Sequence, residues 1–498
     1  MDGPGNRLFH TLINQQLKQK NCDPAIIVID NQEISDTAAQ ADALAEYYEE
    51  LSTPALKDNY DDTFYTEIKR DNVCILQLLE HAESTGLITT QDVHTAISDL
   101  HTKCASDGNN LMAEHLIKAK DVISPAIAML LRKLHELNYL PTMLKSGYVL
   151  SIPKKGKDPK HPSGHRGITI SSVLSKVVES VYKVRHEETQ LYHQDELQFG
   201  FSKGYSPVMA ALIVTELIGE AKSLNRTIYI ASLDARKAFD VVDHNILLHT
   251  LYDEGCDLDA IRTFQELYTG LRNKVVWRGQ DSRDYDVKQG VRQGGVWSAT
   301  LYKSYVNGLL AKLRRGDLGA KIGTQYLGSP TVADDLLLVS FCVYELQCMF
   351  DLSGDYADQR RYDFQPSKTV VISIKPDARS TEECVSPVWT VRDEEVTVKD
   401  SLVHVGIPRF SSNVPDTTID TRINAASKCA YALMGSGLHG YNGIGAKTSL
   451  QIIKTYVLPR LLYGLEVMLL SRKQIDVLST YYNGLLKQIQ GLPMTTAT

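Results

Sequence analysis

Three aspartates stand at the ends of two apolar segments, roughly a hundred residues apart in a chain of 498 residues. Asp234 follows a β-branched and aromatic run at 226–233, and the pair Asp334-Asp335 precedes an apolar run at 336–339. Both runs have the composition of buried strands. An acidic pair that enters a buried strand is unfavourable unless cations neutralise it. If the two strands meet, the three carboxylates can hold two Mg²⁺ ions about 3.5–4 Å apart, an arrangement that stabilises the attacking and leaving oxygens of a phosphoryl transfer.

The alternative for an isolated Asp-Asp pair is a solvated turn, because Asp favours turns. Other segments favour the metal site. A strand at 147–153 runs into a basic loop that carries Lys154 and Lys155, and Arg166 lies on the returning strand. Such a basic hairpin suits a triphosphate, whose oxygens need Lys or Arg on the side away from the metal ions. A glycine-rich segment at 289–296 precedes a helix and lets the backbone approach a ligand closely.

The net charge of -7 is unusual for a protein that binds nucleic acid, but the charge is unevenly distributed. Residues 1–133 hold 21 Asp and Glu against 11 Lys and Arg, so this region carries -10 and the remainder +3. The stretches 145–166 and 409–498 are the most basic, the second with nine Lys and Arg against four Asp and Glu. Because local charge sets the field at a groove, both stretches can face nucleic acid; each can equally be a solvated surface.

The eight cysteines are scattered and form no metal-finger pattern, which is typical of free thiols in a reducing compartment. The first residues contain no apolar leader, and nowhere do 18 apolar residues follow one another. We therefore expect an intracellular protein, in the nucleus or the cytoplasm, without a membrane span.

Local signals predict two capped helices, one in the N-terminal region and one after the strand that ends at Asp234. Ser35 or Asp36 can cap a helix that reaches Leu51, and Asp243 can cap a helix that Gly255 ends.

Taken in order, these segments resemble the reverse transcriptase of non-LTR (LINE-like) retrotransposons over roughly residues 140–470. The individual blocks are short, but their order and spacing together are highly specific. Val332, Gly167 and Ala299 depart from the residues usual in that family. The matching blocks are 152–155 with 165–169, 198–204, 233–240, 289–295, 333–335, 366–369 and 404–407.

The resemblance implies an α+β right-hand polymerase with fingers, a palm formed by an antiparallel sheet backed by helices, and a helical thumb. It further implies an RNA template, a DNA primer, dNTPs and two Mg²⁺ ions, with Mn²⁺ as a possible substitute. By position, Asp234 and Asp334 are the bridging metal ligands, Asp335 is the accessory carboxylate, and Ala235 belongs to the metal site.

The resemblance also assigns the residues that bind the nucleotide. Phe239 falls at the steric gate, where an aromatic ring beneath the sugar excludes a 2′-OH. The other residues line the nucleotide or face its phosphates: Gln293, Gly294, Arg166, Lys154, Lys155 and Lys368.

We expect an N-terminal linker and helical extension at 1–105, fingers at 106–225, a palm at 226–408 and a helical thumb with a C-terminal extension at 409–498. No endonuclease motif is visible in residues 1–140 and no Cys/His knuckle follows the thumb, so we expect a truncated element or a fragment. Two alternatives stay open. One is an inactive remnant that only binds RNA, which the three retained aspartates disfavour; the other is an enzyme that makes RNA, which Phe239 disfavours. The oligomeric state and the RNA that is copied cannot be predicted.

Overall fold

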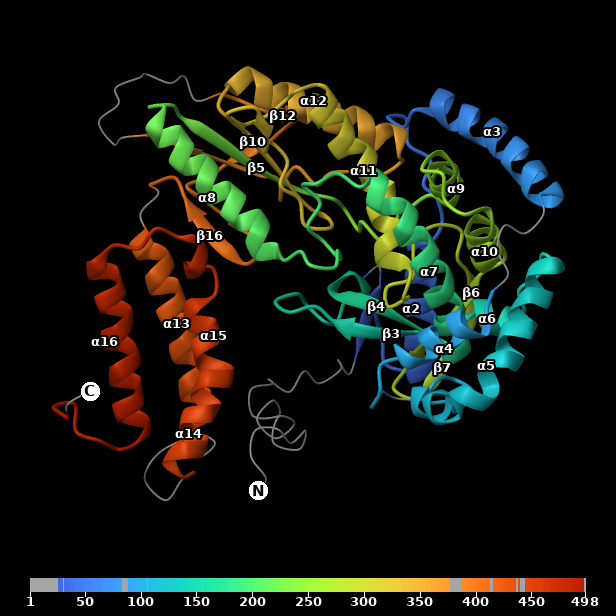
Figure 1. The fold of residues 1–498 in the computed structure, drawn as a ribbon, viewed down its shortest axis with the longest axis horizontal. Coiled ribbons are helices and arrows are strands. Elements are labelled where there is room, and N and C mark those ends of the chain that lie inside the picture. Colours follow the sequence, from blue (N-terminus) through green and yellow to red (C-terminus); the bar gives the residue numbers. More distant parts are fainter. Residues whose placement is uncertain are drawn as a thin grey trace.

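The computed structural model describes residues 26–496 except 30, 83–87, 105, 377–386, 413–414, 436–437 and 439–443. The fold mixes helices and sheets, and a four-stranded sheet, called the central sheet below because helices cover both of its faces, lies in the upper left part of Figure 1. The strands run in the order β10-β5-β11-β14; the first three are antiparallel to their neighbours, and the edge strand β14 is parallel to β11. The strands are β5 (Ile228–Asp234), β10 (Asp335–Ser340), β11 (Val370–Ile374) and β14 (Thr397–Val398).

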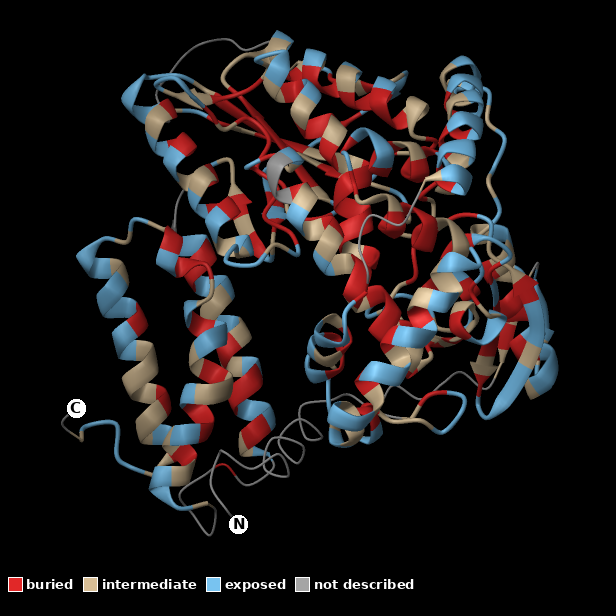
Figure 2. Ribbon diagram, turned by 45° about the vertical axis from the view of Figure 1, so that its right-hand side comes forward, coloured by how far each residue is buried: buried red, intermediate tan, exposed pale blue. Residues whose placement is uncertain are grey.

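Helices cover both faces of this sheet, as the alternating side chains of β5 require. Ile228 and Ile230 face the helix α8 in one core, while Tyr229, Ala231 and Leu233 face the opposite core. Figure 2 shows buried residues along the three longer strands of the central sheet and on the inner faces of these helices, whereas both residues of the edge strand β14 are exposed. The helices against the sheet are α8 (Pro207–Ser223), α11 (Ser298–Arg315) and α12 (Val343–Gln359).

A second four-stranded sheet carries the basic hairpin. Its order is β4-β3-β6-β7, and β3 pairs with β4 in antiparallel register, which confirms the hairpin expected from the sequence. Helix α2 (Thr37–Leu51) packs on this sheet, where the Trp277 ring nitrogen donates to the Gln40 side chain at 2.9 Å. The strands are β3 (Gly147–Pro153), β4 (His165–Ser171), β6 (Arg272–Trp277) and β7 (Gln280–Asp286).

The N-terminal helices pack into the same molecule and do not form a separate unit. Asp36 caps α2 by accepting from the Ala39 amide at 2.9 Å, as the sequence predicts. Residues of α3 and α4 belong to the core that lies beneath the central sheet. The helices around this core are α3 (Asp62–His81), α4 (Thr90–Ser98), α5 (Ala113–Glu136), α6 (Thr142–Lys145), α7 (Val173–His193), α9 (His244–Asp253) and α10 (Leu258–Tyr268).

The C-terminal helices form a bundle with a core of its own. In Figure 1 this bundle stands to one side of the central sheet and is joined to it through the hairpin of β15 and β16. The elements are β15 (Ser401–His404), β16 (Ile407–Phe410), α13 (Pro415–Met434), α14 (Ala446–Ile452), α15 (Leu458–Leu462) and α16 (Arg472–Ile489).

Short strand pairs and single turns complete the described part of the chain. Among the described residues, no helix is long and apolar enough to cross a membrane. The six cysteines that the structure describes are free thiols, and Cys22 and Cys384 lie outside the described residues. The remaining elements are β1 (Ile27–Ile29), β2 (Gln32–Ile34), β8 (Lys321–Ile322), β9 (Gln325–Tyr326), β12 (Thr390–Val391), β13 (Glu394–Glu395), and the turns Pro162–Gly164, Ile453–Val457 and Leu465–Val467.

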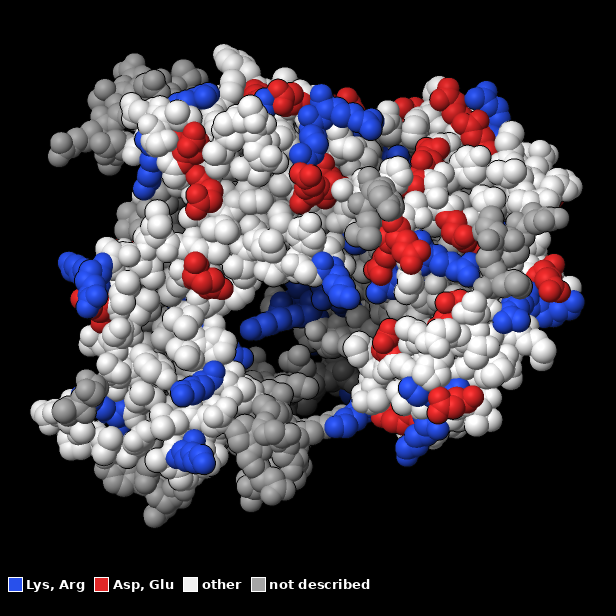
Figure 3. Space-filling view, viewed as in Figure 1, with Lys and Arg blue, Asp and Glu red and all other residues white. Residues whose placement is uncertain are grey.

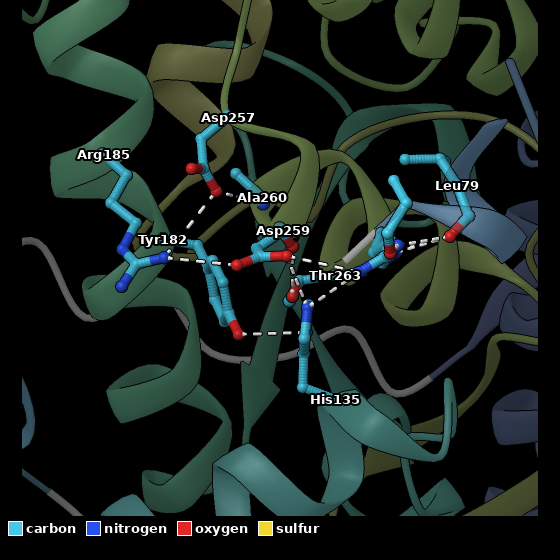
Figure 4. Close-up of polar contacts among 10 residues, drawn as sticks. Leu79, His135, Tyr182, Arg185, Asp257, Asp259, Ala260 and Thr263 are labelled. Carbon is cyan, nitrogen blue, oxygen red and sulfur yellow. Dashed lines mark hydrogen bonds and ion pairs between the residues drawn. The ribbon is translucent and has the colours of Figure 1, made fainter. Parts of the chain in front are cut away.

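A buried ionic network fastens four helices together around Asp259 (Figure 4). Asp259 is 1% exposed and lies 2.7 Å from His135 Nε2, 3.4 Å from Arg262 Nη1 and 3.8 Å from Arg185 Nη1. Arg262 also donates to the Leu79 carbonyl at 2.8 Å, at the end of α3. Because α3, α5, α7 and α10 each contribute a partner, the network ties these four helices to one another.

Removing the Asp259 carboxylate leaves buried cations without their common partner. We therefore expect Asp259→Ala to lower the free energy of unfolding by about 3–5 kcal/mol, measured by urea denaturation. The matched control is Glu136→Ala, since Glu136 pairs with Lys133 at the surface with 63% of its side chain exposed, and its loss should change stability by less than about 1 kcal/mol. Equal effects of the two substitutions would show that the network adds nothing to stability.

Candidate active site

The three aspartates come together at one end of the central sheet. Asp234 is the last residue of β5 and Asp335 the first of β10, and the two are paired in the antiparallel register. Asp334 lies at the tip of a two-residue turn, which backbone hydrogen bonds between Val332 and Asp335 close at 3.1 and 3.0 Å. Ala235, next along from Asp234, forms an isolated bridge with Phe364. The structure thus brings together the three carboxylates that the sequence placed on separate segments.

Burial and the neighbouring negative charge both oppose the ionisation of Asp334 and Asp335. Desolvation raises the pKa of both Asp334 and Asp335, and the charge of Asp234 raises each of them further. Two contacts partly offset this repulsion: Lys368 Nζ lies 3.0 Å from Asp234 Oδ2, and the Val405 amide donates to Asp335 Oδ2 at 3.3 Å. Divalent cations would relieve the remaining repulsion, and a set of carboxylate oxygens suits Mg²⁺.

In the described part of the chain, no three His, Cys, Asp or Glu side chains are already arranged around a single point that could hold an ion. Lys368 and the Val405 amide each donate to one of the carboxylates, Asp234 and Asp335 respectively. The three residues fit divalent ions by type, since carboxylate oxygens suit Mg²⁺, and Lys368 would have to release Asp234 to a bound metal.

Phe239 is held firmly in the turn that follows β5. Its ring stacks on Tyr302 of α11, with ring centroids 4.6 Å apart and planes inclined by 14°, and Phe201 contacts it edge-on at 6.2 Å. Tyr302 is 3% exposed, so it forms a fixed base beneath the Phe239 ring. The sequence analysis predicted a role for Phe239 but did not predict that Tyr302 would pack beneath it.

Gln293 and Gly294 lie against the basic hairpin. The Gln293 carbonyl accepts from the Thr169 amide at 2.8 Å, and a Cβ atom added to Gly294, whose φ is 114°, would come within 2.8 Å of the Thr169 carbonyl oxygen. The Gln293 side chain donates to Asp240 Oδ1 at 2.6 Å. Asp240 therefore joins the turn after β5 to the glycine-rich loop, a role that the sequence analysis missed because the two segments are 53 residues apart.

The cations approach the carboxylates to different degrees. Arg166 is exposed on β4; burial raises the pKa of both Asp334 and Asp240, and the Arg166 charge offsets a small part of each rise. Lys154 donates to the Ser163 carbonyl at 3.1 Å; desolvation lowers its pKa, as do the charges of Arg166 and Lys368. Lys155 lies beyond it, exposed in the hairpin loop. Lys154, Arg166 and Lys368 thus form one cationic group, which Lys155 does not visibly join.

The family model for "Reverse transcriptase (RNA-dependent DNA polymerase)" matches residues 152–401, which is half of the chain and contains all three aspartates. The chain belongs to the reverse transcriptase family. The Asp334-Asp335 pair lies inside this domain and at a sheet end that it shares with Asp234.

Curated relatives are non-LTR retrotransposon proteins that carry this domain. The Pol polyprotein of the type-1 retrotransposable element R2 of Popillia japonica is 25% identical over 67% of this chain and 46% of its own length. The polyprotein of the type-2 element R2DM of Drosophila melanogaster is 26% identical over 58% of this chain and 26% of its own length. The probable RNA-directed DNA polymerase from the Drosophila melanogaster X-element is 25% identical over 68% and 37%. The chain thus spans less than half the length of each of these relatives.

The Lys368–Asp234 contact predicts a competition between the lysine and divalent cations. We expect Lys368→Met to strengthen Mn²⁺ binding to the protein alone by up to about fivefold, the scale of an exposed ion pair, measured by isothermal titration calorimetry. The control is Lys222→Met. Lys222 lies in the last turn of α8, near the start of β5, whereas Asp234 lies at the opposite end of that strand. Weaker or unchanged Mn²⁺ binding in Lys368→Met would contradict the competition.

Proposed function

We propose that this chain is an RNA-directed DNA polymerase of a non-LTR retrotransposon, which extends a DNA 3′-OH on an RNA template. The observation that carries the proposal is the pairing of Asp234 with Asp335 beside Asp334, inside the matched reverse transcriptase domain. In this proposal residues 106–225 act as fingers, 226–408 as palm and 409–498 as thumb, with 1–105 as an N-terminal extension.

Asp234, Asp334 and Asp335 would hold two Mg²⁺ ions, or Mn²⁺ in their place, with Ala235 at the same site. Bound there, the ions acidify the primer 3′-OH and stabilise the charge on the leaving pyrophosphate. No protein nucleophile is required, so the protein supplies position and charge. The surroundings of Asp334 and Asp335 support the proposal: burial raises the pKa of both carboxyl groups, and the neighbouring charge of Asp234 adds to the rise, so a nearby cation would favour their ionised forms.

Residues around the carboxylates would position the nucleotide. Arg166 and Lys154 face the triphosphate from the hairpin, Lys155 supports them from its loop, and Lys368 meets the pyrophosphate as it leaves. Gln293 and Gly294 line the base and sugar, and the Phe239 ring lies beneath the sugar, where a 2′-OH would collide with it. The stacking of Phe239 on Tyr302 supports the last assignment, because a gate must not move aside.

The surface charge supports a nucleic-acid path through the molecule. Figure 3 shows Lys and Arg side chains in and around the hollow at the middle of this face, between the C-terminal bundle and the rest of the protein. Residues 409–498 carry nine Lys and Arg against four Asp and Glu, although the whole chain is acidic. We propose that the RNA template and the DNA primer occupy this hollow, inside the cell, in the nucleus or the cytoplasm.

Extension of oligo-dT on poly-A RNA tests the activity. We expect dTTP incorporation that requires Mg²⁺ and falls at least about a hundredfold in Asp234→Ala. The substitution removes a proposed ligand of the metal ions that would stabilise the charge of the transition state. Asp253→Ala is the matched control, because Asp253 lies 62% exposed at the end of α9. Incorporation that survives in Asp234→Ala would mean that the metal site is misassigned. If the wild-type protein binds RNA but never extends the primer, the chain is an inactive remnant.

Sugar selection tests the gate. Phe239→Ala removes the ring and should increase ribonucleotide incorporation relative to deoxynucleotide by at least about tenfold, measured as the ratio of kcat/KM values. Phe239→Tyr keeps the ring in its stack on Tyr302 and should keep the discrimination of the wild type. An unchanged ratio in Phe239→Ala would remove Phe239 from the gate.

A further inference from the structure

The turn that carries Asp334 has a conformation that its sequence does not favour. Ala333, immediately before Asp334, has a φ of 59°. This left-handed region suits glycine at the first position of a two-residue turn, whereas an alanine Cβ is crowded there. A strained backbone at a functional site persists only where its surroundings hold it in place. The position of Asp334 therefore depends on whatever fixes Ala333.

Gln198 fixes Ala333 through both of its backbone groups. The side-chain Oε1 of Gln198 accepts from the Ala333 amide at 2.8 Å, and its Nε2 donates to the Ala333 carbonyl at 3.4 Å. The same Oε1 accepts from the Gly200 amide at 2.9 Å. Gln198 is 1% exposed, so water does not compete for these bonds. The Gln198 side chain thus forms the two hydrogen bonds to the Ala333 backbone that a neighbouring strand would otherwise provide, although the two residues are 135 positions apart.

The backbone on either side of Gln198 is hydrogen-bonded to Thr331, which lies just before the turn that carries Asp334. The Phe199 amide donates to the Thr331 carbonyl, and the Thr331 amide donates to the Leu197 carbonyl, each at 2.8 Å. Gly200 lies so close that a Cβ atom there would be 2.2 Å from the Ala333 nitrogen. Only glycine fits at this contact. The close approach to Ala333 therefore explains why position 200 is a glycine, although its φ is not positive.

The segment that presents Gln198 is itself anchored to α11. Asp195 is 8% exposed and accepts from Arg314 Nε at 2.7 Å and Nη2 at 2.8 Å. The Asp195 amide donates to Asn307 Oδ1 at 2.7 Å. Since α11 also carries Tyr302, one helix supports both the steric gate and the segment that holds the acidic turn.

We propose that Gln198 is a positioning residue for the acidic turn: by holding Ala333 in its left-handed conformation, it aims the Asp334 carboxylate at Asp234. The inference rests on the proposed function, in which these two carboxylates share the metal ions. Gln198 touches neither the nucleotide nor the metal in this account and acts only through Ala333.

The test compares two buried glutamines. Gln198→Met keeps the volume and removes both hydrogen bonds to Ala333. Gln190→Met is the control, because Gln190 is 3% exposed and donates to the Thr300 carbonyl and to Ser304, away from the turn. We expect Gln198→Met to weaken Mn²⁺ binding to the protein alone about tenfold, and to raise the Mg²⁺ concentration for half-maximal extension by a similar factor. Gln190→Met should change neither quantity by more than about twofold, even if it lowers the melting temperature equally.

A second substitution should rescue the first. Glycine adopts a φ of 59° without strain, so Ala333→Gly in the Gln198→Met background should recover most of the lost Mn²⁺ affinity. If Gln198→Met does not fold, Gly200→Ala replaces it, since its Cβ displaces the Ala333 nitrogen and should weaken Mn²⁺ binding in the same way.

Wild-type Mn²⁺ affinity in both Gln198→Met and Gly200→Ala, or a failure of Ala333→Gly to rescue Gln198→Met, would overturn the proposal. Because Mn²⁺ binding is measured without nucleic acid or nucleotide, it separates the two claims. A wild-type protein that binds Mn²⁺ but never extends a primer would end the proposed function and leave the role of Gln198 to be decided by the affinities.

Discussion

Negative charge gathered at one end of a buried sheet is the constraint on which the rest of this structure depends. The register of β5 and β10 pairs Asp234 with Asp335 and leaves Asp334 at the tip of the turn beside them. Burial raises the pKa of Asp334 and Asp335, and the repulsion between neighbouring carboxylates adds to the rise. The apolar strands behind them cannot compensate, so positive charge has to come from outside the sheet.

The surrounding elements supply part of that charge and a rigid frame. Lys368 reaches Asp234 from the segment before β11, and Arg166 approaches Asp334 from the hairpin of the second sheet. Asp240 binds Gln293 and so ties the turn after β5 to the loop that precedes α11. These contacts connect the central sheet to the basic hairpin and to α11. They meet beside the three aspartates, where phosphoryl transfer would need the substrate, cations and carboxylates close together.

The sequence predicted the features that depend on local chemistry. Asp36 and Asp243 cap the helices expected for them, and the apolar runs beside the aspartates form strands. Features that depend on distant contacts could not be predicted in this way. The support of Ala333 by Gln198 and the stack of Phe239 on Tyr302 join segments far apart in the chain, and an alanine gives no sign that its φ is positive. The parallel edge strand β14 has only two residues, too few for a pattern.

The most direct measurement is the location of metal in crystals grown with Mn²⁺, a primer–template whose 3′ end is chain-terminated, and the matching dNTP. Anomalous scattering should show two Mn²⁺ ions about 3.5–4 Å apart, both within coordination distance of Asp234 and Asp334. In the same crystals Lys368 should have left Asp234. Manganese bound elsewhere, with Lys368 still on Asp234 and the Val405 amide still on Asp335, would contradict the account.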